Sequence, residues 1–288
     1  MRGMSRMVNM DAVWDRSMEF VSDNLGAVLA IVIPFIFIPQ AIGAVMEKPA
    51  TDAEAVAAIV FAVIGVIAAL AGVVGQTMLT ALVLDPDAGA TAARARGLRR
   101  FLPIIGVSLV LAAAMLLLFV PIILILAAYG FNMVAASTGA AQPELPPVAA
   151  AWSALYVIVL MPVFFFLAAR LILVMPALVD APIGLGAIRR SWSLTRGMTL
   201  KIIGVIILFA IVAIFLTLGV SAGLGALLKI VAGGDGVLTV ADVLIALVAA
   251  LVATGLAVVQ TVFVARLYVA AVARHASVPV DPLAEPAG

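Results

Sequence analysis

The polar side chains most unusual for their surroundings are two arginines and two glutamines that lie inside long apolar stretches. These are Arg170, Arg266, Gln76 and Gln260. An arginine at the centre of a bilayer costs roughly 2.5 kcal/mol or more, and it usually faces the protein interior or water. Arg170, Arg266 and Gln76 therefore predict a site for an anion, either a lipid phosphate or an anionic solute. The alternative is that each arginine reaches the bilayer surface or caps a neighbouring helix end.

Carboxylates that could pair with these arginines are found only at the ends of the apolar stretches. Asp85 and Asp180 are the nearest acids along the chain. At a rise of about 1.5 Å per residue, Arg170 lies about 15 Å along a helix from Asp180. Arg196 follows the same stretch, and we expect it either to extend to the surface or to pair with an acid such as Asp180.

Several kinds of catalytic chemistry lack their residues in this sequence. The chain has no cysteine, and its one histidine is His275, near the C-terminus. The lack of cysteine excludes thiolate chemistry, and no histidine lies inside an apolar stretch to serve a zinc cluster or a Ser-His-Asp triad within the membrane. The sequence also has no phosphate-binding loop of the Walker type, no HExxH and no GxSxG. We therefore expect no catalytic residues, no metal, no cofactor and no enzymatic activity.

The composition requires a lipid environment. Of 288 residues, 66% are hydrophobic and only 11% are charged, whereas soluble domains are about half apolar and a quarter charged. Six apolar stretches reach the roughly 20 residues that a span needs, at residues 25–46, 55–83, 102–129, 150–178, 200–231 and 238–270. Each must be helical, because lipid offers backbone groups no partner. The prediction is an all-α polytopic bundle.

The distribution of basic residues sets the expected orientation. They gather in alternate connections: Arg2, Arg6 and Arg16, then Arg94, Arg96, Arg99 and Arg100, then Arg189, Arg190, Arg196 and Lys201, and finally Arg274. The other connections hold only Lys48 and Lys229. Basic loops stay in the cytoplasm, so both termini are expected there. Residues 1–24 then form a cytoplasmic amphipathic segment, 25–270 one transmembrane domain, and 271–288 a disordered tail. A net charge of +1 gives no field for nucleic acid.

An internal repeat is indicated by three similar stretches about 94–98 residues apart, at 73–89, 167–184 and 263–276. Their alignment places Gln76, Arg170 and Arg266 at matching positions. One period holds two spans, so the copies share one orientation and are parallel repeats. We expect three consecutive hairpins, and the alternative is chance similarity between helices rich in Ala, Val and Leu.

Short interfacial helices are expected before the hairpins. Residues 11–25 place Trp14, Met18, Val21 and Leu25 on one helical face, which is typical of a helix at the membrane surface. Residues 184–199 repeat this pattern less cleanly. Their basic residues either bind anionic lipid or only fix the topology.

Proline and glycine predict irregularities within the spans. Kinks are expected at five prolines, Pro34, Pro39, Pro121, Pro162 and Pro176. Gly219 and Gly223 form a GxxxG pair, which predicts a closely packed face.

Residues 169–208 carry a more specific pattern. They combine an arginine in a span, an acid at its end, a turn of small residues and Arg-Ser-Trp-x-Leu-Thr-x-Gly: Arg170, Asp180, Gly184, Gly186, Arg190, Ser191, Trp192, Leu194, Thr195 and Gly197. This segment resembles the membrane domain of bacterial glycerophosphoryl diester phosphodiesterases and related six-helix membrane families, although the acid there is commonly Glu. The resemblance implies a bacterial inner-membrane location. It implies no activity, because the chemistry of those enzymes belongs to a separate soluble barrel.

The expected function is that of a non-catalytic membrane protein acting as a lipid-associated scaffold or accessory subunit. The alternative is a small transporter or flippase-like carrier for an anionic lipid or solute. Expected partners are membrane lipids, anionic ones among them, and a membrane-protein partner or a second copy of the chain. The candidate residues for a ligand or lipid phosphate are Arg170, Arg266, Gln76, Asp180, Arg190, Ser191 and Trp192.

Overall fold

The computed structural model describes residues 9–51, 55–131, 146–232 and 238–276, and every regular element in these ranges is helical. Six helical stretches in this part of the chain are long and apolar enough to cross a membrane: Leu25–Glu47, Val56–Leu84, Pro86–Ala128, Pro147–Asp180, Thr199–Leu228 and Val240–Ala276. This is the pattern of a multi-pass membrane protein. The prediction of an all-α polytopic bundle is therefore confirmed, while the repeat stays a prediction.

The first two spans follow a surface helix. The elements are α1 (Met10–Asp23), α2 (Leu25–Val32), a π-helical turn η1 (Ile33–Phe37), α3 (Ile38–Thr51) and α4 (Ala55–Leu84). Asn9 caps α1 by accepting a hydrogen bond from the amide of Asp11. The π turn contains Pro34, which cannot donate to the carbonyl of Ala30 four residues earlier. An irregularity was predicted at this proline, and the π turn provides it.

A distant arginine satisfies the carbonyl that Pro34 leaves without its helical donor. The Nη2 atom of Arg94 donates a hydrogen bond to the oxygen of Ala30. Backbone groups at membrane depth need a partner within the protein, so this contact compensates for the proline and ties α2 to the third span.

The third and fourth spans are longer than the sequence predicted. A short 3-10 turn η2 (Pro86–Ala88) leads into α5 (Gly89–Ala128), and α7 (Pro147–Leu171), α8 (Val174–Asp180) and α9 (Gly186–Leu194) follow. The arginines at 94–100, which we assigned to a connection, belong to the first turns of α5. No helix breaker separates them from the apolar part, because Pro103 is accommodated inside the helix. The separate interfacial helix expected before this span is therefore wrong.

The last two spans are α10 (Thr199–Leu218), a second π turn η3 (Gly219–Leu224), α11 (Gly225–Ala232) and α12 (Val240–Ala276). Because α12 runs to Ala276, residues 271–276 are helical and the predicted start of the disordered tail at 271 is wrong. The remainder of the predicted tail, 277–288, lies outside the described residues, as do 1–8.

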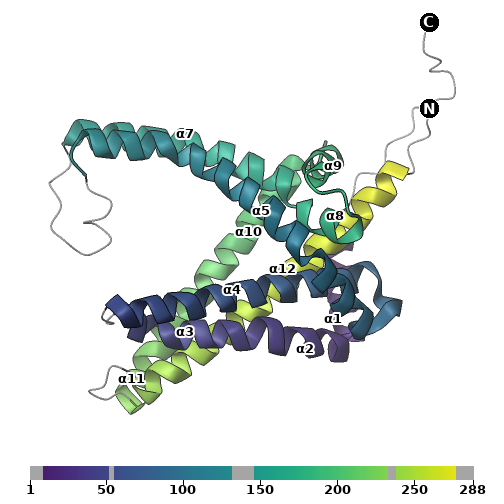
Figure 1. Cartoon of the computed structure of the whole chain (residues 1–288), viewed down its shortest axis with the longest axis horizontal. Helices are drawn as coiled ribbons and strands as arrows, with labels where there is room; N and C mark the ends of the chain where they lie inside the picture. Colours follow the sequence, from purple (N-terminus) through teal and green to yellow (C-terminus); the bar gives the residue numbers. More distant parts are fainter. Residues whose placement is uncertain (1–8, 52–54, 132–145, 233–237, 277–288) are drawn as a thin grey trace, which may run out of the picture.

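Neighbouring spans pack on one another, and α12 also packs on α3 and α4. Helix α3 packs on α4, α5 on α7, and α10 and α11 on α12. Figure 1 shows α5 and α7 running side by side as an arm that leaves the pair α3 and α4. A junction lies where α1, α8 and α9 meet the ends of α4 and α12, and it contains most of the large buried side chains: Leu79, Leu82, Leu173, Val179, Ile202, Val262 and Leu267.

Away from the junction the spans expose apolar surface. In the most apolar part of Val56–Leu84, and of Pro86–Ala128, no residue is buried. Ile59, Ile67, Leu117 and Ile158 are each more than 60% exposed. Surfaces this apolar are stable against acyl chains rather than water.

Two glycines allow helices to cross closely at the junction. A Cβ atom at Gly97 of α5 would lie 2.6 Å from Cγ of Met78 and 2.8 Å from its Cα. A Cβ atom at Gly75 of α4 would lie 2.6 Å from Cγ1 of Ile36. The predicted close-packed pair is wrong, because nothing lies within 4 Å of such an atom at Gly219 or Gly223.

Helix α1 packs on the protein with a face other than the one predicted to meet the membrane. Val13, Ser17 and Phe20 are buried, and α1 packs on α12. The hydroxyl of Ser17 donates to the carbonyl of Val13 at 2.6 Å, which allows this polar side chain to be buried. Trp14 is 43% exposed and contacts the rings of Phe209 and Phe263.

Candidate functional site

Arg170 lies in the last turn of α7 and connects that helix to α9. Its Nη1 atom donates to the carbonyl of Trp192 at 3.2 Å. The guanidinium also lies 5.2 Å from the ring centres of both Phe166 and Trp192, within the range of cation–π attraction. Two roles were predicted for Arg170: binding an anion, or reaching the surface or capping a neighbouring helix end. These contacts correspond to capping, because Trp192 is in the last turn of α9.

Ser191 completes this connection from the other side. It is fully buried, and its hydroxyl donates to the carbonyl of Arg170 at 2.6 Å. The helix is interrupted just after Arg170, so this carbonyl is one of the groups a helix end leaves without its own donor. The structure thus brings Arg170, Ser191 and Trp192 together, as parts of a joint between two helices.

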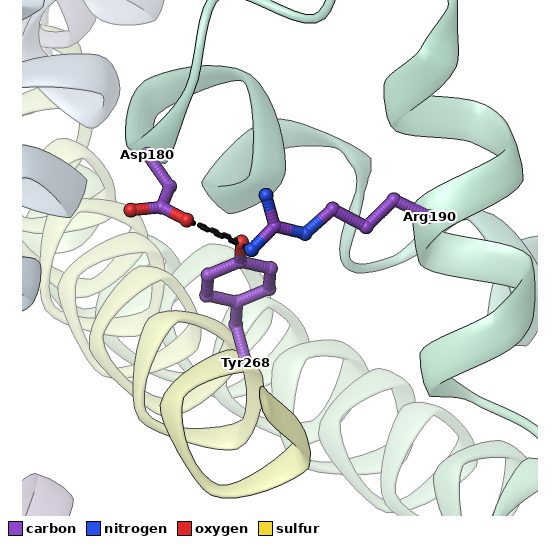
Figure 2. A network of polar contacts seen from close by, with 3 residues as sticks. All are labelled: Asp180, Arg190 and Tyr268. Carbon is purple, nitrogen blue, oxygen red and sulfur yellow. Dashed lines mark hydrogen bonds and ion pairs between the residues drawn. The ribbon is translucent and has the colours of Figure 1, made fainter. Parts of the chain in front are cut away.

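Asp180 forms a second joint with two other elements (Figure 2). Its Oδ2 atom accepts hydrogen bonds from Nη2 of Arg190 at 3.0 Å and from the hydroxyl of Tyr268 at 2.7 Å. The guanidinium of Arg190 lies 5.3 Å from the centre of the Tyr268 ring. Asp180 ends α8, Arg190 is on α9 and Tyr268 is on α12, so the network holds three elements. Of the two alternatives for Arg196, the pairing with Asp180 is not formed, because Arg190 takes that place and Arg196 is exposed.

The acid after the second span is paired in a similar way. Asp85 lies 3.8 Å from Nη1 of Arg96, and both side chains are more exposed than those of Asp180 and Arg190. In both places the acid ends an apolar stretch and its arginine lies on the following helix. Exposed pairs of this kind contribute little to stability.

Arg266 is placed apart from Arg170. It lies on α12, and its guanidinium is 4.8 Å from the ring centre of Phe20 on α1. The same helix α1 carries the charged side chains Arg16 and Glu19. Like Arg170, Arg266 carries a buried Nε atom without a hydrogen-bond partner within the described residues. Each predicted arginine therefore stacks on an aromatic ring of a surface helix.

Gln76 faces a cavity instead of an arginine. A cavity of about 180 Å³ lies between α4, α8 and α12, and Gln76, Thr80, Gln260 and Thr261 form its polar wall. Neither Arg170 nor Arg266 lines it. The three side chains predicted to frame one anion site thus fall at three places, and the anion site stays a prediction.

A second, more apolar space adjoins this cavity, and a third adjoins the second. A cavity of about 240 Å³ between α10 and α12 shares Ile172, Gln260 and Val264 with the first. A groove of about 400 Å³ on the other side of these helices shares Phe209 and Leu256 with that second cavity and reaches Trp14. Together the spaces form an amphipathic region with one polar end.

Tyr268 is a contact residue that the sequence analysis missed, as are Phe20 and Phe166. Its signal was weak, since it is one tyrosine in an apolar helix, two residues after Arg266. Asp180, Arg190, Ser191 and Trp192 are all engaged in contacts between helices. Among the described residues no group of His, Cys, Asp or Glu could hold a metal ion.

No protein-family model, characterised protein or solved structure matches this chain.

Proposed function

We propose that this chain is a non-catalytic membrane protein of the bacterial inner membrane that acts as a lipid-associated scaffold or accessory subunit, with both termini in the cytoplasm. The proposal includes the resemblance to the membrane domain of glycerophosphoryl diester phosphodiesterases, which rests on residues 169–208. It also includes partners of two kinds: anionic lipids, and a membrane protein or a second copy of the chain.

The observation that carries the proposal is how the junction uses its polar residues. Arg170, Asp180, Arg190 and Ser191 are all engaged between helices, and none lines the cavities described above. A rigid end built in this way can present a fixed surface. Exposed basic side chains surround it: Arg16, Arg99, Arg189, Arg196 and Lys201. Each basic group near an anionic membrane surface attracts it by about 1 kcal/mol.

Lipid selectivity tests the first part of the proposal. Nanodiscs of mixed phosphatidylglycerol and phosphatidylethanolamine would hold the purified chain, and native mass spectrometry would count the lipids that stay bound. We expect phosphatidylglycerol to be enriched, and the enrichment to fall in the double variant Arg189→Gln, Arg196→Gln and at high salt. Asp87→Asn, which removes an exposed charge of opposite sign, is the matched control. Equal retention of the two lipids would contradict the proposal.

The carrier alternative makes a different prediction. Reconstituted vesicles with a fluorescent anionic lipid in one leaflet would show protein-dependent movement if the chain were a carrier. We expect no movement above that of protein-free vesicles. Cross-linking in intact cells should instead recover a membrane-protein partner or a second copy of the chain. Saturable lipid movement would overturn the scaffold proposal.

A further inference from the structure

Three polar side chains in the cavity between α4, α8 and α12 lack hydrogen bonds. Within the described part of the chain, the side chains of Gln76, Gln260 and Thr261 make no hydrogen bond, although all three residues line this cavity. Gln76 precedes Asp85 by nine residues and Gln260 precedes Arg274 by fourteen, which places them about 13 and 21 Å along their helices. Polar side chains at such depth are costly unless something hydrogen-bonds to them.

The chemistry of the cavity wall excludes a preference for a charged group. The wall combines two amides and two hydroxyls, and it contains no Lys, Arg, His, Asp or Glu. The hydroxyl of Thr80 already donates to the carbonyl of Gln76 at 2.8 Å, so it is left as an acceptor. An amide both donates and accepts hydrogen bonds. The matching ligand group is therefore an uncharged hydroxyl or ester.

The apolar cavity between α10 and α12 indicates which chemical group the ligand carries beside its hydroxyl or ester. Gln260 lies at the boundary between the two spaces, and beyond it the second cavity is lined by apolar side chains such as Val205, Phe209 and Leu256. The two spaces together fall at the lower end of the roughly 300–1,000 Å³ of ligand sites. A molecule that fills both needs a small polar head and an apolar chain.

We propose that the adjoining cavities around Gln76 and Gln260 bind one membrane lipid with an uncharged, hydroxyl-bearing headgroup, the chemistry of diacylglycerol. The amides of Gln76 and Gln260 hold the glycerol hydroxyl and ester groups, and an acyl chain extends past Gln260 toward Phe209. This site is distinct from the basic residues at the junction, which carry the proposed attraction to anionic lipid.

Photoaffinity labelling tests the site on the full-length chain in nanodiscs. The probe is a diacylglycerol with a diazirine in one acyl chain, and labelled peptides are located by mass spectrometry. We expect labelling in α8, α10 and α12 around the two cavities. Gln76→Leu and Gln260→Leu should each weaken labelling roughly three- to tenfold, the effect of one lost hydrogen bond. Leu251→Ala, on an exposed part of α12 outside these cavities, is the control and should label normally.

Competition on the unaltered chain provides a second measurement that does not depend on folding of variants. Unlabelled diacylglycerol should displace the probe, and phosphatidic acid with the same chains should do so at least tenfold less well. Equal competition by the two lipids, unchanged labelling in both glutamine variants, or labelling spread evenly over the exposed spans would overturn the proposal. The Arg189→Gln, Arg196→Gln variant should label normally, so failure of this site and failure of the proposed scaffold role are distinguishable.

Discussion

Arg94 is the side chain on which the first span most directly depends. Replacing it by methionine keeps its length but leaves the carbonyl of Ala30 without a donor beside Pro34. Ala30 is exposed on the apolar surface, and a backbone carbonyl that faces lipid without a donor is costly because no water can replace the lost partner. Arg94→Met should therefore lower the melting temperature in detergent, as followed by circular dichroism. Arg99→Met, five residues along the same helix and exposed, should change it little, and equal effects of the two would contradict this assignment.

Tyr268 should contribute to stability through its hydroxyl. Tyr268 is only 2% exposed, and its bond to Asp180 joins α12 to α8 (Figure 2). Tyr268→Phe removes this hydrogen bond and keeps the ring, with an expected loss of about 1 kcal/mol, because the carboxylate is partly exposed to solvent. In the background Asp180→Asn, the same substitution should cost measurably less. A double-mutant cycle of unfolding free energies measures this coupling, and strictly additive losses would contradict it.

The sequence predicted which side chains are unusual, but not what each contacts. Arg170 and Asp180 stand out because charged residues are rare beside apolar stretches. Their partners, Trp192 and Tyr268, are aromatic residues whose role depends on where helices cross. Crossing points are set by packing between distant segments, which a single sequence does not reveal.

The helix crossings at Gly75 and Gly97 should tolerate no side chain. At Gly97 the obstructing atoms include the backbone of Met78, which cannot rotate away. Gly97→Ala and Gly75→Ala should each destabilise the protein by about 1–3 kcal/mol. The controls Gly106→Ala and Gly72→Ala have open space and should be neutral or slightly stabilising, because alanine favours helix. Unfolding in mixed micelles measures the difference, and tolerated alanines at Gly75 and Gly97 would refute these crossings.

Helix contacts explain why the glycine prediction failed. Gly219 and Gly223 have the GxxxG spacing, yet they lie in a π turn with open space around them. Gly75 and Gly97 have no such spacing, and their role comes from crossings with η1 and with Met78. The existence of the six long helices was predictable, because it follows from apolar length alone. The positions of the glycines at which these helices cross closely were not predictable.

Orientation in the bilayer follows from charge and is open to a direct test. The chain has no cysteine, so a single introduced thiol can be labelled without background. Asp87→Cys, in the exposed turn η2, should react with a membrane-impermeant maleimide only after cells are permeabilised. Ser137→Cys, in the connection between the third and fourth spans, should react in intact cells. The reverse pattern would overturn the cytoplasmic assignment of both termini.

The arrangement of the pairs was less predictable than their number. The apolar composition predicted long apolar helices, and the structure contains them. The divergence of α5 and α7 from α3 and α4 (Figure 1) depends on the close crossings and polar joints at one end. These are long-range contacts, and none of them leaves a periodic signal in the sequence.

The packing of α1 on α12 joins the first described helix to the last one. During synthesis on the ribosome, α1 emerges long before α12. The ring of Phe20 therefore stays uncovered until Arg266, whose guanidinium lies over it in the folded protein, has been translated. Domains otherwise tend to fold from the N-terminus as they are made. In a truncated nascent chain α1 would therefore stay undocked. Cellular proteases could then recognise this exposed helix and degrade the incomplete protein.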